Sequence, residues 1–174
     1  IAGGANTSAV QVLWNSAGPE WIAANYTAPN GCSASAPVQL GVIANPLPVP
    51  SVTGPASACA GTPMTYSTDP GMTGYQWAVS PGGTIVTGTA THTVQVQWAT
   101  AGNGWVSVNY TNTTGCTGAS ASVFPVTVFN PPTPSITGVS TVCAGASNIF
   151  YSTESGMGNY QWTVSTGGTI LSGT

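Results

Sequence analysis

The chain has 174 residues, of which only 2% are charged: there is no lysine and no arginine, and the acids are Glu20, Asp69 and Glu154. Soluble domains ordinarily devote roughly a quarter of their residues to charged side chains. Without lysine or arginine the chain has no side chain to neutralise phosphates, which excludes nucleic-acid binding and the binding of anionic membranes by a basic surface. The hydrophobic fraction of 41% still suffices for a core, so the low charge does not indicate disorder.

Short apolar runs broken by Gly, Pro, Asn and Ser predict strands and turns, and no segment predicts a helix or a membrane span. In residues 93–98, for example, Val94, Val96 and Trp98 share one face and two glutamines share the other, the pattern of a half-buried antiparallel strand. Seven short strands predict an all-β, immunoglobulin-like β-sandwich. They are expected, in chain order, at 51–53, 64–67, 75–79, 84–86, 93–98, 105–110 and 123–129.

The chain is built from a repeat of 84 to 85 residues. Proline clusters at 46–50 and 131–134 recur at one phase of this repeat, and we expect them to mark module boundaries. The predicted domains are a late half-module (1–47), a complete module (48–131) and an early half-module (132–174). The repeated positions are Trp14, Trp21, Tyr26, Cys32 and Cys59, which return 84 positions later as Trp98, Trp105, Tyr110, Cys116 and Cys143, and Tyr66, Tyr75 and Trp77, which return 85 positions later as Tyr151, Tyr160 and Trp162.

This frame of Cys, Tyr, Trp and Gly, with phrases such as YQWAVSPGGTI, TVQVQW and NYTNTTGC, resembles the PKD-like, immunoglobulin-like modules found in tandem in very large secreted proteins of Bacteroidota. The resemblance covers the whole chain. It implies a bacterial cell-surface adhesin of the gliding-motility kind, exported by type IX secretion. The implied location is extracellular, and the implied partners are adjoining modules of the same polypeptide or copies of the chain itself.

The inventory of reactive side chains favours no enzyme, no metal site and no cofactor. Catalysis needs a nucleophile with its base, paired carboxylates or a metal set, and His92 is the only histidine. Asp69 and Glu154 occupy the same place in their modules. A calcium site would need six to eight oxygen ligands, so a role in a turn is the better interpretation of these acids.

The four cysteines show none of the usual zinc spacings and are interpreted as disulfide partners in an oxidising compartment. Each module has one cysteine near its second strand and one after its sixth. We therefore predict a bond between Cys59 and Cys116 within the complete module. Cys32 and Cys143 are expected to find partners in the adjoining half-modules.

Strand parity divides the aromatic residues into two groups. Trp105 and its counterpart Trp21 have the opposite parity to the inward residues of their strands, so we expect them to face outward as a candidate contact surface. The others are predicted to lie in cores: Trp14, Trp77, Trp98, Trp162, Tyr26 and Tyr110.

We therefore interpret the chain as a non-enzymatic repeat segment of an extracellular filament or adhesin. The alternative is a carbohydrate-binding or spacer module of a secreted polysaccharide-degrading protein, with surface glycans as possible ligands of the outward aromatic residues. A weaker alternative is ice binding by the threonine-rich stretch at 84–93, which is not repeated in the other copies.

Overall fold

The computed structural model describes residues 7–173, and the chain divides into two compact units, Ile1–Asn130 and Pro131–Thr174. Within the described residues the regular structure consists of strands, with no helix, which confirms the predicted all-β class. The strands are β1 (Gly18–Ala24), β2 (Val38–Ala44), β3 (Ser57–Cys59), β4 (Met64–Ser67), β5 (Thr73–Val79), β6 (Gly83–Thr87), β7 (Thr93–Trp98), β8 (Gly102–Thr111) and β9 (Ser122–Phe129).

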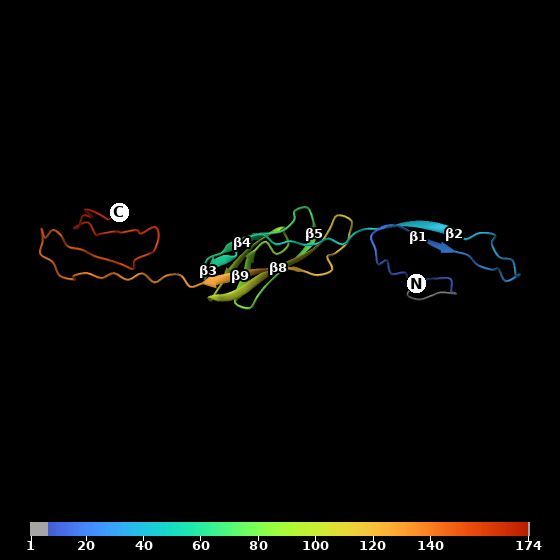
Figure 1. Ribbon diagram of the computed structural model, residues 1–174, viewed down its shortest axis with the longest axis horizontal. Helices are drawn as coiled ribbons and strands as arrows, with labels where there is room; N and C mark the ends of the chain where they lie inside the picture. Colours follow the sequence, from blue (N-terminus) through green and yellow to red (C-terminus); the bar gives the residue numbers. More distant parts are fainter. Residues whose placement is uncertain (1–6, 174) are drawn as a thin grey trace. The chain divides into compact units, whose positions relative to one another are not determined.

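Strands β3 to β9 form the complete module (Figure 1). One sheet has the order β3-β9-β8-β5 and the other the order β4-β7-β6. Every pairing in them is antiparallel except that of β3, which runs parallel to β9. This arrangement confirms the predicted immunoglobulin-like β-sandwich.

The core of the module lies between the two sheets, because apolar residues alternate along the strands. The smaller sheet supplies Tyr66, Val94, Val96 and Trp98. The larger sheet supplies Ala58, Val106, Val126 and Val128. Complete burial of a side chain such as valine stabilises the fold by about 1.5–3 kcal/mol.

Trp98 is the largest fully buried side chain of this core. Its ring meets that of Tyr66 edge to face, with centroids 5.9 Å apart and planes at 81°. Two glycines leave room for the indole: a Cβ atom at Gly83 would lie 3.0 Å from its Nε1, and one at Gly104 would lie 2.9 Å from it. The glycines of the GGT and NGW sequences are therefore part of the packing around Trp98.

The strand predicted at 51–53 is wrong. Thr53 forms only an isolated bridge with Ser67, in which the two backbones exchange hydrogen bonds of 2.8 and 2.9 Å. Prolines at 50 and 55 limit pairing on both sides, because proline has no N–H to donate. The chain instead joins a sheet at β3, where Cys59 pairs with Phe129.

The late half-module contains the hairpin β1-β2, whose local structure repeats that of β8-β9. Trp21 lies opposite Gly41 in the first hairpin, and Trp105 lies opposite Pro125 in the second. Both positions of the second pair lie 84 residues after those of the first. The following loop repeats as well, since Asn25 donates to the carbonyl of Ala34 and Asn109 to that of Gly118.

The early half-module has no strand among its described residues and is drawn as orange and red coil in Figure 1. It nevertheless keeps local contacts of the complete module. Thr137 bridges Ser152 as Thr53 bridges Ser67. The Tyr151 hydroxyl donates to the carbonyl of Val139 at 3.0 Å, and the Tyr66 hydroxyl donates to the Pro55 carbonyl at the same distance.

Candidate assembly interface

Asp69, the acid of the complete module, ties together the two halves of that module. Its Oδ2 accepts a hydrogen bond of 2.6 Å from the hydroxyl of Tyr110 on β8 and one of 3.3 Å from Ser51. Its backbone carbonyl accepts a bond of 2.8 Å from the hydroxyl of Tyr75 on β5. The carboxylate therefore stabilises a turn and anchors a strand that lies 41 residues later in the sequence. Sequence reasoning predicted the turn but missed Tyr110.

Glu154 occupies the corresponding turn of the early half-module. It accepts hydrogen bonds from the Ser135 hydroxyl at 2.6 Å and from the Thr153 hydroxyl at 2.6 Å. Its backbone carbonyl accepts a bond of 2.7 Å from the hydroxyl of Tyr160, the counterpart of Tyr75. The tyrosine that would correspond to Tyr110 is Tyr26 in the repeat, and its side chain is 78% exposed.

These contacts also fix the acid–base properties of the site. Burial and, to a smaller extent, the hydrogen bond to Asp69 raise the pKa of Tyr110 to about 12. Burial raises the pKa of Tyr66 to about 12 as well. Hydrogen bonds from Ser135 and Thr153 lower the pKa of Glu154 to about 2, so this carboxylate is ionised at neutral pH. Such groups suit a structural network better than proton transfer near pH 7.

The half-modules expose side chains whose counterparts are buried in the complete module. Trp98 is 2% exposed and Trp14 is 36% exposed; Tyr110 is 3% exposed, against the 78% of Tyr26. Trp14 and Tyr26, which were predicted to lie in a core, are exposed here, because the described residues of the late half-module lack the strands that would cover them. Their burial in a completed module stays a prediction. The early half-module shows the same contrast, since Tyr66 is fully buried and Tyr151 is 49% exposed.

The remaining aromatic predictions have mixed outcomes. Trp77 is partly buried and packs against the core, and its indole N–H donates to the carbonyl of Thr91 at 2.8 Å. Trp162 is also partly buried. The two tryptophans expected to face outward are 37% exposed at Trp105 and 61% exposed at Trp21.

The predicted disulfide between Cys59 and Cys116 is not formed, and the sheet register explains why. Cys59 pairs with Phe129 at the end of β9, whereas Cys116 lies in the loop before the first residue of β9, Ser122. Seven residues of strand separate these ends, a span of about 23 Å. A disulfide needs Cα atoms less than about 7 Å apart, so the module itself cannot make this bond. All four thiols are free in the structure.

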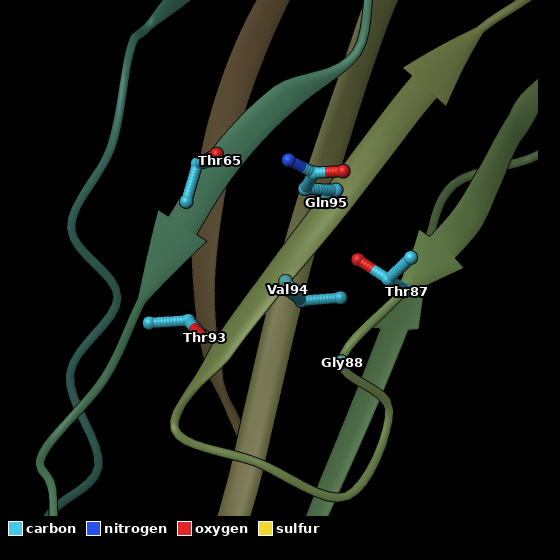
Figure 2. A pocket seen from close by; sticks show the side chains of 6 residues that line it. All are labelled: Thr65, Thr87, Gly88, Thr93, Val94 and Gln95. Atoms are coloured by element: carbon cyan, nitrogen blue, oxygen red, sulfur yellow. The ribbon is translucent and has the colours of Figure 1, made fainter.

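A shallow hollow of about 200 Å³ lies on the smaller sheet and is lined by the residues labelled in Figure 2. Thr65, Gln95 and Thr87 come from three adjacent strands, β4, β7 and β6. The lining contains no aromatic ring on which a sugar could stack and no ionisable group for catalysis. This hollow therefore supports neither the carbohydrate-binding alternative nor an enzymatic function.

The part of the chain that the structure describes offers no group of His, Cys, Asp or Glu side chains suited to a metal ion. The same part contains no helix that is long and apolar enough to cross a membrane.

The sequence matches a known protein family, and the fold is similar to a solved structure. The family model described as a PKD-like domain matches residues 45–126 and again residues 130–174. A solved structure, the S-layer protein SbsC domains 4 and 5, is similar over 63% of this chain and 70% of that chain, with 12% sequence identity and a TM-score of 0.31. A search of curated proteins found no match.

Proposed function

Because this chain belongs to the PKD-like domain family, we propose that it is a non-catalytic, load-bearing segment of an extracellular filament or cell-surface adhesin. In this proposal its partners are adjoining modules or copies of itself. The resemblance of the sequence to tandem modules of secreted Bacteroidota proteins extends the proposal to a bacterial surface protein exported by type IX secretion. The free thiols of the structure are compatible with later oxidation in such a compartment.

The observation that carries the proposal is the difference in burial between counterpart residues. The same repeat buries Tyr66, Trp98 and Tyr110 when both of its halves are present. It exposes Tyr151, Trp14 and Tyr26 when one half is alone. Large exposed apolar faces and open sheet edges favour pairing with another segment. A second half-module supplies the matching face.

Mechanical continuity follows from this arrangement. Each complementing pair would form a sandwich whose strands come from two successive segments, so tension along the filament would act on ladders of backbone hydrogen bonds and not on a surface contact alone. Proline-rich boundaries of a few residues limit bending between modules, since proline restricts the backbone. The resulting repeat array is quasi-one-dimensional.

The test is the assembly state of the purified chain under reducing conditions, measured by light scattering and negative-stain electron microscopy over a range of concentrations. We expect linear assemblies with an axial repeat of two modules per chain. A chain that stays monomeric at all accessible concentrations would contradict the proposal.

The exposure of Trp21 and Trp105 favours a second candidate function, recognition of surface glycans by outward tryptophans. Replacing both by serine separates the two functions, because neither residue belongs to the buried core cluster. A contact role in assembly predicts weaker association and unchanged glycan binding. Loss of binding to a soluble glycan array with normal assembly would support the carbohydrate-binding alternative.

A further inference from the structure

The four cysteines fall into two structural classes. The loop cysteines, Cys32 and Cys116, close equivalent turns: the carbonyl of Cys32 accepts from the amide of Ala28 at 2.8 Å, and that of Cys116 accepts from Asn112 at 2.9 Å. The strand cysteines, defined as Cys59 on β3 and its counterpart Cys143, precede equivalent turns, in which the amides of Thr62 and Ala146 donate to their carbonyls at 3.1 Å. In the complete module these two classes lie at opposite ends.

Each class lies where one module meets the next. The thiol of Cys116 contacts the backbone carbonyl of Asn45 at 3.8 Å, and Asn45 directly follows β2, the last strand of the late half-module. At the other end of the complete module, Cys59 pairs with Phe129, the last residue of β9. The amide of Ala60 donates to the carbonyl of Phe129 at 2.8 Å.

The repeat brings these two positions together. Phe129 is the counterpart of Asn45. The residues directly before them, Val128 and Ala44, lie opposite the equivalent glycines Gly102 and Gly18. A loop cysteine of the following module would therefore contact the carbonyl of Phe129, as Cys116 contacts that of Asn45. Cys59 already neighbours that same residue, so by this extrapolation a strand cysteine and a loop cysteine would meet at each boundary.

We propose that the strand cysteine of each module forms a disulfide with the loop cysteine of the following module, so that in an assembly of copies of this chain Cys59 bonds Cys32 of the next copy and Cys143 bonds its Cys116. This inference rests on the proposed filament, in which an early half-module is completed by a late half-module of an adjoining segment or copy. Each of the four cysteines then has one partner, and each bond crosses a module boundary. The filament becomes covalently cross-linked at every module boundary.

The oxidation is a thiol–disulfide exchange with a small-molecule disulfide. The thiolate of a strand cysteine attacks one sulfur of that disulfide and releases one small thiol. The thiolate of the loop cysteine then attacks the protein sulfur of the mixed disulfide and releases the second small thiol. Two cysteine thiols are oxidised, the small disulfide is reduced by two electrons, and the two protons leave on the released thiols.

Four variants of the full chain, each keeping two cysteines, test the pairing in a buffer of oxidised and reduced glutathione. C116A/C143A keeps Cys59 and Cys32, and C32A/C59A keeps Cys143 and Cys116. We expect both to give reducible ladders of dimers and higher oligomers on non-reducing gels, with the two named cross-links found by peptide mass mapping. These variants contain the pairs that the proposal joins.

The matched controls keep the wrong pairs. C32A/C143A keeps Cys59 with Cys116, and C59A/C116A keeps Cys32 with Cys143. We expect both to assemble and yet lose the ladder, with thiols that alkylate freely. Ladders of equal strength in all four variants, or a bond within one chain in C32A/C143A, would overturn the pairing. Assembly of every variant without any ladder would overturn the disulfides and leave the filament intact, whereas absence of assembly under reducing conditions would overturn the filament as well.

Discussion

The complete module and the half-modules repeat one sequence pattern and differ in what their side chains contact. Both keep the short-range structure: the Thr–Ser bridges, the tyrosine hydroxyl bonds and the hairpin register recur at counterpart positions of the repeat. Within residues 7–173, only the complete module has a core between two sheets. The comparison shows that turns and hairpins of this repeat are locally determined, while burial requires both halves.

The largest expected effect of a substitution separates Trp98 from its counterpart Trp14. Trp98→Ala should cost about 3–5 kcal/mol of unfolding free energy, because it empties a large site in a closed core. Trp14→Ala should change the unfolding free energy of the unassembled chain by less than about 0.5 kcal/mol, the usual range for surface substitutions. Urea unfolding followed by circular dichroism under dilute, reducing conditions measures both. Equal costs would show that the halves are already closed in the free chain.

A second matched pair compares two glycines that lie against tyrosine rings. A Cβ atom at Gly54 would collide with the buried ring of Tyr66, and one at Gly138 would collide with the exposed ring of Tyr151. Gly54→Ala should cost about 1–3 kcal/mol as overpacking. Gly138→Ala should cost less in the free chain, because Tyr151 can turn toward solvent, and should instead weaken assembly. Urea unfolding and light scattering of the two variants distinguish these outcomes, and a smaller cost for Gly54→Ala than for Gly138→Ala would contradict the comparison.

Tyr110→Phe removes the hydroxyl that joins β8 to Asp69 and should cost about 1–3 kcal/mol, because a carboxylate loses its short hydrogen bond. Tyr26→Phe should leave the unfolding temperature of the unassembled chain unchanged. It should weaken assembly, since this hydroxyl would reach Glu154 only across a completed sandwich. Thermal unfolding of both variants, with assembly measured in parallel, tests the difference. Assembly of Tyr26→Phe with the affinity of the unsubstituted chain would remove the role assigned to this hydroxyl.

The sequence predicted the sandwich well because its strands carry a clear period of two. It also predicted the repeat, because aromatic and glycine positions return at a fixed spacing. It could not predict the cysteine partners: spacing along the chain does not reveal that β3 runs parallel to β9 and so places Cys59 at the far end from Cys116. The contact between Asp69 and Tyr110 was missed for a similar reason. The only sign of this contact in the sequence was that both positions, the acid and the tyrosine, recur in the repeat.

The smallest expected effect is that of salt. The assembly interface has no lysine or arginine, so there are no Lys or Arg ion pairs for sodium chloride to screen. The dissociation constant of the assembly should change less than about two-fold between low salt and 0.3 M sodium chloride, where screening of ordinary surface ion pairs is already strong. Sedimentation velocity measures it, and dissociation of the assemblies in this range would mean that attraction between charges holds them together.

The central claim is that an early and a late half-module complete each other. Hydrogen exchange of the purified chain, measured by mass spectrometry at two protein concentrations under reducing conditions, tests it most directly, because the complementary half then comes from another copy. The account predicts that amide protection in residues 8–14 and 149–171 rises strongly with concentration, while protection in residues 93–110 of the complete module stays constant. Protection in the half-modules that does not depend on concentration would contradict the account.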